Sequence, residues 1–439
     1  MNDHVLFRRL VIAVLGAALV SPQATAQDAG SPLSLQDCVR MALHVPSPVS
    51  LAKRDRDIAD KGIVIARAGF LPGSALSSGY TYNSPNRFQR DSMSYVSFNG
   101  IREFVGLATI FQEIDVSGRL RAEYALARAQ QSAAGVNMMI AERDLKRAVG
   151  AAYYRLLLAR HLVDVVRDAL AESDAFERRV QLLFGGGEAA RADVVKASSQ
   201  TAFLRQALLS AELASSMANQ DLAAYWTTDV DAPLSLVDSF SQPEMEPEFA
   251  APGVESTQTG LAPYLRRPEF RLFDAQSQGF AAQARAARAA LLPQLRWNFQ
   301  YGLDVNQLAW NNRGYAAFAT LDIPIFDWCR ARSGARQFRL QAEQVTETRA
   351  ISERRFSQEY RSALARVKQF RAQITLCREQ VDLAGEDLKL SRIRYEGGEG
   401  AAVEVVVAQN QVAQARSNYY SSIANYRTAQ LDLEVAAGQ

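Results

Sequence analysis

One stretch of the sequence decides the fold, Leu295-Arg296-Trp297-Asn298-Phe299-Gln300-Tyr301-Gly302-Leu303-Asp304. Apolar and polar residues alternate along it, and a period of two is that of a β-strand, whose successive side chains point to opposite faces. One face holds Leu295, Trp297, Phe299, Tyr301 and Leu303, and the other holds Arg296, Asn298, Gln300 and Asp304. Such a strand is typical of a membrane barrel with lipid outside and water inside. A half-buried strand of a soluble sheet has the same periodicity, so both interpretations stay open here.

Three further strands are expected around this one. A partner should follow at about 314–325, where Pro324 closes it, and the first half of the chain offers an equivalent pair at about 75–83 and 95–114. Four strands cannot close a barrel, and an open sheet edge is not tolerated in lipid. A membrane sheet of this kind therefore needs strands from other copies of the chain.

The chain contains an internal duplication. Arg67-Ala68-Gly69-Phe70-Leu71-Pro72 returns as Arg288-Ala289-Ala290-Leu291-Leu292-Pro293, and Phe184-Gly185-Gly186-Gly187-Glu188 returns as Tyr395-Glu396-Gly397-Gly398-Glu399. This period is too long for a solenoid unit of a few tens of residues. We therefore divide the chain into a first repeat at 27–226 and a second at 266–439. The intervening segment, 227–265, is rich in proline and is either a belt around the helices or partly disordered.

Long helices fill the rest of each repeat. We expect them at 119–184 and 188–226 in the first repeat, and at 330–395 and 401–437 in the second. A heptad seam runs along the third of these, through Tyr360, Val367, Ile374, Val381, Leu388 and Tyr395. A sustained period of seven predicts left-handed supercoiling. At 1.5 Å per residue the longest helices reach about 100 Å. An elongated coiled coil without a channel would explain the helices equally well, but not the strands.

The N-terminus reads as a secretory signal peptide over residues 1–26. A basic start with Arg8 and Arg9 is followed by an apolar run over 10–20 and by the small-residue site Ala24-Thr25-Ala26. No cysteine stands at that site, where a lipid-anchored protein would carry one. We expect an exported chain that is not lipidated.

Composition argues against nucleic acid and against catalysis. The 49 Lys+Arg residues nearly balance the 47 Asp+Glu residues, whereas a nucleic-acid binder shows a basic patch or stripe. Beyond the signal peptide only His44 and His161 remain, neither at ligand spacing from a cysteine or a carboxylate, and three scattered cysteines form no framework. The glycine run at 185–187 lacks the Lys-Ser/Thr of a phosphate loop. We expect no catalytic, cofactor-binding or metal site, and hence no enzyme.

Taken together, these features resemble the TolC-type outer membrane factors. The similarity extends over nearly the whole mature chain and rests on the order of short motifs. They are Leu33-Ser34-Leu35-Gln36-Asp37, the two Arg-Ala-x-x-Leu-Pro entries into strands, Arg266-Arg267-Pro268-Glu269, Pro324-Ile325-Phe326-Asp327 and Arg394-Tyr395-Glu396-Gly397-Gly398.

The resemblance implies a homotrimer in the bacterial outer membrane that extends into the periplasm. Its fold would be mainly α, with a twelve-stranded barrel made of four transmembrane strands per subunit and an α-barrel of coiled-coil helices. The implied function is the passive exit duct of a tripartite efflux pump or a type I secretion system. The implied partners are outer-membrane lipid, a periplasmic adaptor (membrane fusion) protein, and an inner-membrane pump or ABC transporter.

The resemblance also assigns the site residues. The tips of the helical hairpins, where an adaptor would bind, correspond to Gly185, Gly186, Gly187, Gly397, Gly398 and Gly400. The periplasmic gate would use Glu404 and, by the internal repeat, Asp193. The alternative interpretation of both carboxylates is a solvated acidic residue in a first helical turn, stabilised by the helix N-terminus.

A second function stays open at this stage: a periplasmic structural or adaptor coiled coil without its own pore. The two functions differ in the environment of Leu295–Leu303, which faces lipid in the duct and soluble protein in the adaptor. Neither interpretation names the cargo, because drugs, metal ions and polypeptides all fit an unshaped polar duct.

Overall fold

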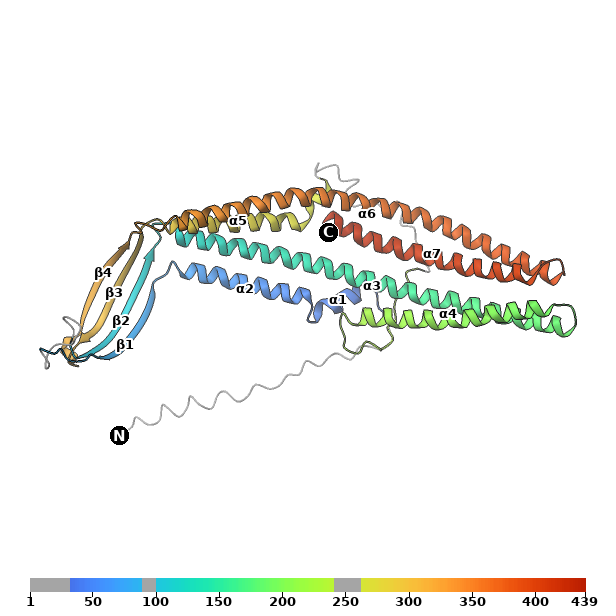
Figure 1. The fold of residues 1–439 in the computed structure, drawn as a ribbon, viewed down its shortest axis with the longest axis horizontal. Coiled ribbons are helices and arrows are strands. Elements are labelled where there is room, and N and C mark those ends of the chain that lie inside the picture. The colour runs from blue at the N-terminus through green and yellow to red at the C-terminus, as the bar shows by residue number, and fades with distance from the viewer. Residues whose placement is uncertain (1–31, 89–99, 241–261) are drawn as a thin grey trace, which may run out of the picture.

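The computed structural model describes residues 32–88, 100–240 and 262–439 (Figure 1). The signal peptide assigned to 1–26 lies outside these ranges. The elements in chain order are α1 (Leu35–His44), α2 (Pro48–Ala68), β1 (Gly73–Tyr82), β2 (Arg102–Ile114), α3 (Arg119–Gly185), α4 (Arg191–Ala223), η1 (Pro263–Arg266), α5 (Pro268–Ala289), β3 (Gln294–Val305), η2 (Trp310–Asn312), β4 (Gly314–Asp322), α6 (Arg330–Glu396) and α7 (Ala402–Ala437). The predicted fold class is confirmed: the chain is mainly helical with one small antiparallel sheet.

Several predicted boundaries differ from those observed. β2 begins at Arg102, and residues 95–99 of the expected strand lie outside the described part. β4 ends at Asp322 rather than 325, since Pro324 has no N–H to donate to a ladder. α4 begins at Arg191 rather than 188, because Gly187 adopts a left-handed conformation and the chain needs three more residues to reverse. The remaining strand and helix ends fall within two residues of the expected positions, apart from the end of α4 at Ala223.

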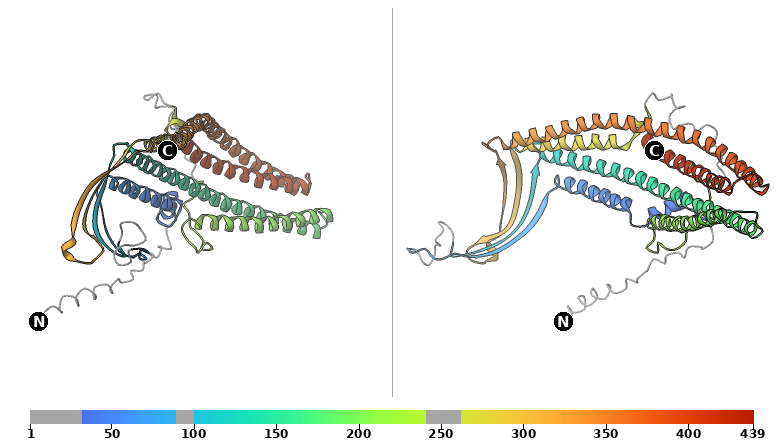
Figure 2. Two further views of the ribbon diagram at one scale, coloured as in Figure 1. Left: turned by 60° about the vertical axis from the view of Figure 1, so that its left-hand side comes forward. Right: turned by 45° about the vertical axis from the view of Figure 1, so that its right-hand side comes forward.

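The molecule is elongated, with the sheet at one end and two helical hairpins at the other (Figures 1 and 2). α3 and α6, each of 67 residues, run the length of the helical part. In the half next to the sheet, α2 packs on α3, and α5 lies between α3 and α6. In the distal half α4 packs on α3, and α7 lies between α3 and α6. α5 and α7 thus each pack between the two long helices, α5 in the half next to the sheet and α7 in the distal half. One free edge of the helical part is formed by α2 and α4, and the other by α6.

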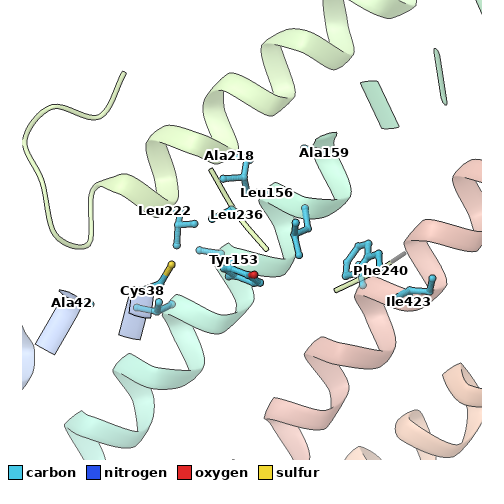
Figure 3. Close-up of a cluster of buried hydrophobic side chains, with 14 of the residues drawn as sticks. Cys38, Ala42, Tyr153, Leu156, Ala159, Ala218, Leu222, Leu236, Phe240 and Ile423 are labelled. Atoms are coloured by element: carbon cyan, nitrogen blue, oxygen red, sulfur yellow. The ribbon is translucent and has the colours of Figure 1, made fainter. Parts of the chain in front are cut away.

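The main hydrophobic core lies midway along the molecule (Figure 3). Cys38 of α1, Leu156 of α3 and Leu222 of α4 are fully buried there with Phe240 of the segment after α4. That segment pairs with the N-terminal end of the described chain through a parallel bridge between Leu33 and Leu236.

Hydrogen bonds attach the same segment to the helices. The Tyr153 hydroxyl donates to the Val237 carbonyl oxygen at 2.7 Å. The Asn219 side-chain amide donates to the Ala232 carbonyl oxygen and accepts from the Leu234 N–H. Residues 227–240 of the expected linker therefore pack against the helices, and residues 241–261 lie outside the described ranges.

Candidate functional site

The sheet has one apolar face. Paired residues of antiparallel strands share a face, so the register extends the alternation of β3 to its neighbours. The odd-numbered residues of β3 share this face with Phe104, Ala108, Ile110 and Ile114 of β2, Leu76, Tyr80 and Tyr82 of β1, and Tyr315, Ala317, Ala319 and Leu321 of β4. Its uncharged polar members are Gln112 of β2 and Ser74 and Ser78 of β1. Aromatic rings stack along this face, with 6.4 Å between the ring centroids of Trp297 and Phe299 and 6.3 Å between those of Phe299 and Tyr315. Arg102, the first residue of β2, is the one charged residue of the described strands on this face.

The opposite face is predominantly polar. It carries Arg296, Asn298, Gln300 and Asp304 of β3 with Glu103, Thr109 and Glu113 of β2, Ser77 and Thr81 of β1, and Thr320 and Asp322 of β4. The apolar side chains of Val105, Leu107, Phe111 and Phe318 interrupt it. A sheet with two such faces is suited to stand between an apolar phase and water.

Gly302 is a point of close backbone approach within the sheet. Its φ is 153°, and a Cβ at this position would lie 1.9 Å from the Gly106 carbonyl oxygen of β2. Backbone atoms cannot rotate away from such a contact, so only glycine fits here.

Both outer strands of the sheet are unpaired on one side. The order is β1-β2-β3-β4, so β1 and β4 each have a single neighbour in the described chain. An exposed strand edge presents a row of free N–H and C=O groups and pairs readily with another strand. Within the described ranges no helix combines the length and the apolar character needed to cross a membrane.

The distal tips reverse direction through matched glycine turns. Gly187 (φ 79°) follows α3 and Gly398 (φ 74°) follows α6, and both adopt the left-handed conformation that favours glycine. The Glu188 N–H donates to the Leu183 carbonyl oxygen at 2.8 Å, and the Glu399 N–H donates to that of Arg394 at 3.0 Å. The other predicted tip glycines need no positive φ. Gly185 is the last residue of α3, and Gly186 and Gly397 cap α3 and α6 in a right-handed conformation. A Cβ added to Gly400 would lie 3.1 Å from the Tyr395 backbone nitrogen.

Glu404, the first gate candidate, is held by an ion pair within its own hairpin. It lies in the first turn of α7, and its Oε2 is 3.1 Å from Nη1 of Arg394 near the end of α6. Both side chains are about half exposed, at 56% for Arg394 and 41% for Glu404. The pair therefore spans the glycine turn and connects the two helices at the tip.

Asp193, the second candidate, lies in the first turn of α4. It interacts electrostatically with Tyr395 of α6, the residue that follows Arg394. Burial raises the pKa of the Tyr395 phenol, and the negative charge of Asp193 raises it further. The two gate candidates therefore interact with consecutive residues of α6, Glu404 with Arg394 and Asp193 with Tyr395. The Tyr395 hydroxyl is buried and has no hydrogen-bond partner in the described part of the chain.

A small core joins the two hairpins near their tips. Phe176 and Val180 of α3 pack with Ala197 of α4 and with Ala402 and Val405 of α7. The Tyr395 ring contacts that of Phe176 edge to face, with centroids 5.3 Å apart. The tips of the two repeats are therefore packed against each other.

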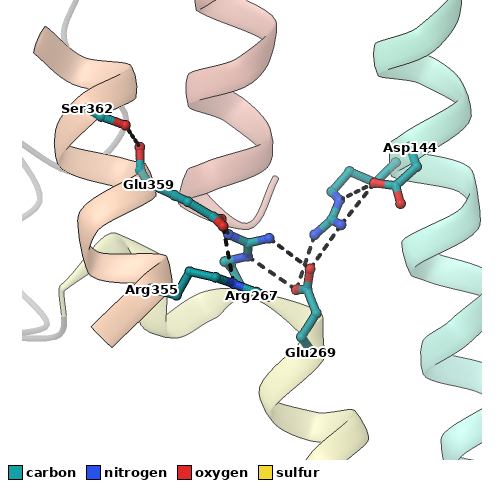
Figure 4. A network of polar contacts seen from close by, with 7 residues as sticks. Asp144, Arg267, Glu269, Arg355, Glu359 and Ser362 are labelled. Atoms are coloured by element: carbon teal, nitrogen blue, oxygen red, sulfur yellow. Dashed lines mark hydrogen bonds and ion pairs between the residues drawn. The ribbon is translucent and has the colours of Figure 1, made fainter. Parts of the chain in front are cut away.

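An ionic network with a largely buried centre joins α3, α5 and α6, and the sequence did not reveal it (Figure 4). Glu269 of α5 is 3.0 Å from Arg143 of α3 and 2.9 Å from Arg267, and Arg267 is 2.6 Å from Glu359 of α6. The Arg267 guanidinium also lies 3.8 Å from the ring centroid of Phe356. Burial alone would raise the pKa of Glu269, but hydrogen bonds from Arg267 and Arg143 outweigh it and lower the pKa to about 2.

His161 is a packing residue. Its ring stacks between Tyr420, at 4.4 Å, and Phe240, at 5.5 Å, and its Nε2 is 3.1 Å from Asp238. In the part of the chain that the structure describes, no three His, Cys, Asp or Glu residues are placed to hold a metal ion.

Comparison with known proteins gives consistent matches along the chain. A family model for "Outer membrane efflux protein" matches residues 49–228 and 264–439. Protein CyaE of Bordetella pertussis is 25% identical over 393 residues, which cover 85% of this chain and 77% of that protein. The toluene efflux pump outer membrane protein TtgF of Pseudomonas putida is 26% identical, with coverage of 74% and 67%. The crystal structure of outer membrane protein VceC from Vibrio cholerae has the same fold, with a TM-score of 0.78 at 16% identity over 92% of this chain and 96% of that one.

Proposed function

Because this chain belongs to the outer membrane efflux protein family, we propose that it is the outer-membrane exit duct of an efflux pump or a secretion system. The observation that carries this function is the two-faced sheet at the end of helices 67 residues long. Lipid would meet the apolar face with Leu295, Trp297, Phe299, Tyr301 and Leu303. Water would meet the face with Arg296, Asn298, Gln300 and Asp304. The family consists of channels. A passive channel has no energy source of its own, so a partner protein would supply the energy for transport.

The proposed assembly is a homotrimer. β1 and β4 are open edges, and lipid does not tolerate unpaired strand edges. Three copies would pair β4 of one chain with β1 of the next and close a barrel of twelve strands. The even strand number suits a bacterial outer-membrane barrel.

The helical part also has two free edges, and both carry apolar stripes. On α2, Leu51, Ile58 and Ile65 recur every seven residues with 68%, 68% and 73% of their surface exposed. On α6, Leu376, Leu383 and Leu390 recur in the same way with 64%, 60% and 53% exposed. A period of seven is that of a seam between coiled helices. These stripes support contact with a second copy of the chain at each edge.

The internal duplication suggests which residues would meet across that contact. Within one chain α5 packs on α3, where a Cβ on Gly279 would lie 3.7 Å from Ala129. Pro293 and Pro72 are related by an offset of 221 residues, and the same offset relates Gly279 to Ile58. Arg330 and Arg119 are related by an offset of 211 residues, and the same offset relates Leu340 to Ala129. Leu340 is 54% exposed. Ile58 of one copy would therefore pack against Leu340 of the neighbouring copy.

A chain with Ile58→Cys and Leu340→Cys is expected to form covalent trimers on mild oxidation. Cys329 is exposed and should be replaced by serine in the background chain. The control is Ile58→Cys with Ile351→Cys, because Ile351 lies 11 residues further along α6, about 16 Å at 1.5 Å per residue. Non-reducing gels measure the species formed. Crosslinking of the control pair but not of the first pair would contradict the proposed register.

The remaining partners follow from the position of the tips. In a duct that spans the outer membrane and the periplasm, the turns around Gly187 and Gly398 are the surfaces that a periplasmic adaptor protein would meet. An inner-membrane pump or ABC transporter would supply the cargo. Signal-peptide cleavage after residue 26, the absence of a lipid anchor, and the repeats at 27–226 and 266–439 with their linker are parts of the same proposal.

The proposed gate consists of Glu404 and Asp193 at the tips. Three copies would place three Glu404 carboxylates around one narrow opening, where they would attract cations. The ion pair with Arg394 gives Glu404 a second effect, since it connects α7 to α6 across the turn. Opening the tip would require this connection to rearrange.

Glu404→Ala is expected to raise single-channel conductance and weaken block by divalent cations. An exposed ion pair contributes about 0.2–1 kcal/mol, so its loss shifts a gating equilibrium by about fivefold at most. Planar-bilayer recordings of the purified duct measure both quantities. The control is Glu399→Ala, another exposed carboxylate of the same turn. Equal currents from Glu404→Ala and the unchanged chain would remove Glu404 from the gate.

A further inference from the structure

Four arginines occupy corresponding positions in the two repeats, close to the sheet. Arg121 and Arg128 lie seven residues apart near the start of α3, and Arg332 and Arg339 lie seven residues apart near the start of α6. The two helices are related by an offset of 211 residues, and the same offset relates Arg121 to Arg332 and Arg128 to Arg339. All four side chains are exposed. A spacing of seven places each pair on a single helix face.

That face points away from the polar side of the sheet. Arg119 donates to Glu113, which lies on the polar face of β2, at 2.5 Å. Arg121 follows two residues later, which is about 200° around the helix, so it points in the opposite direction. Two heptads beyond Arg128 the same face carries Glu142, which lines a groove of about 530 Å³ with residues of α1. Arg121 and Arg128 therefore lie on the side of α3 that α1 covers further along. The 211-residue repeat gives Arg332 and Arg339 the corresponding side of α6.

The arginines begin at the level where the apolar sheet face ends. Arg121 lies about 3 Å beyond the start of α3 and Arg128 about 13 Å, at 1.5 Å per residue. The connection between β4 and α6 adds exposed apolar side chains at this level, with Ile325 at 96%, Phe326 at 70% and Trp328 at 85%. Tryptophan is enriched at membrane–water interfaces because its ring is amphipathic.

The positive charge at this level is only partly neutralised by the chain itself. Arg332 and Arg339 form no ion pair with any described residue, and Arg128 contacts the Tyr124 ring. Of the four, only Arg121 forms an ion pair with a described residue, at 2.9 Å from Asp115. Residues 330–371 contain eleven Lys+Arg against four Asp+Glu, so acidic side chains of α6 cannot balance them.

We propose that Arg121, Arg128, Arg332 and Arg339 form a collar that binds anionic phospholipid headgroups of the periplasmic leaflet. The proposal rests on the sheet spanning the outer membrane. Guanidinium groups bind phosphate through paired N–H donors, and basic residues beside a membrane favour anionic lipid. The apolar face above would contact the acyl chains of the same lipids. In the trimer the two repeats would supply six arginine pairs around the duct.

Tryptophan quenching by brominated lipids tests the collar in the reconstituted duct. Two chains are prepared that keep either Trp297 or Trp328, with the other tryptophans among residues 226, 297, 310 and 328 replaced by phenylalanine. Brominated phosphatidylglycerol and brominated phosphatidylcholine are compared as quenchers. Trp297 should be quenched by both lipids, which reports on insertion of the sheet. Trp328 should be quenched at a mole fraction of phosphatidylglycerol several-fold lower than that of phosphatidylcholine.

Arg332→Gln with Arg339→Gln is expected to remove most of this preference, at about fivefold per arginine. The matched control is Arg354→Gln with Arg361→Gln, two exposed arginines of α6 that lie about 33 Å further from the sheet. This control should keep the preference.

Each adverse outcome points to a different failure. Absence of Trp297 quenching by either lipid would overturn the membrane function itself. Normal Trp297 quenching without a phosphatidylglycerol preference at Trp328, or with a preference that survives loss of Arg332 and Arg339, would overturn the collar alone. Cosedimentation with peptidoglycan sacculi that requires these two arginines, without any lipid preference, would assign them to the cell wall and also overturn it.

Discussion

Gly302→Val is expected to abolish assembly of the proposed trimer in the outer membrane. The substituted Cβ would lie 1.9 Å from the Gly106 carbonyl oxygen, and relieving that overlap requires β2 and β3 to separate. A φ of 153° adds strain for any side chain, at about 1–3 kcal/mol. Because β2 and β3 join the two hairpins of the sheet, their separation would divide it into two strand pairs. The measurement is the heat-modifiable trimer in outer-membrane extracts.

Gly79→Val is the matched control for this substitution. Gly79 lies within β1 on the same polar face, and an added Cβ would have no atom within 4 Å in the described chain. Valine favours strands, so this variant should assemble normally. A normal yield of trimer from Gly302→Val would mean that β2 and β3 can move apart without loss of the sheet.

Glu269→Gln is expected to lower the free energy of unfolding by about 3 kcal/mol, at the lower end of the range for breaking a buried ion pair. The side chains of Arg143 and Arg267 are 11% and 8% exposed, and both would lose their shared carboxylate. A glutamine of the same shape cannot compensate two buried positive charges. Thermal or denaturant unfolding of the detergent-solubilised protein measures the difference.

Acid titration provides a second measurement of the same network. The pKa of Glu269 is lowered from 4.5 to about 2, so its ionised form stabilises the fold fully above pH 4.5. This contribution is lost as the pH falls toward 2. The stability difference between the unchanged chain and Glu269→Gln should therefore be constant near neutral pH and shrink between pH 4.5 and 2.

Asp274→Asn on the same helix is the control. Its ion pair with Arg349 spans 3.8 Å between side chains that are about half exposed, and such a pair contributes less than about 1 kcal/mol. Equal losses of stability from the two variants would show that the network around Glu269 is no stronger than a surface pair.

Features with a local period were predictable from the sequence. The alternation over Leu295–Leu303 located β3 because strand side chains alternate regardless of what surrounds them. The heptads from Tyr360 to Tyr395 located α6 in the same way. Helical turns without proline and matched glycine runs then fixed the hairpins to within a few residues.

Features that depend on distant residues were not predictable. Glu269 and Arg143 lie 126 residues apart in the chain, and nothing in either neighbourhood marks them as partners. The conformation of Gly302 depends on the backbone of β2. The pairing of Glu404 with Arg394 left a weak signal, since opposite charges flank one glycine turn, but the resemblance directed attention to the carboxylate alone.

The unpaired edges of β1 and β4 also have a genetic consequence. If every barrel takes its strands from three copies, one copy with an altered β1 or β4 edge would prevent closure of each barrel that it enters. The intact copies in the same assembly would then lose their function as well. Alleles that alter β1 or β4 but still enter trimers should then be dominant over a normal gene. Alleles that prevent the chain from folding should be recessive, because such chains never reach an assembly.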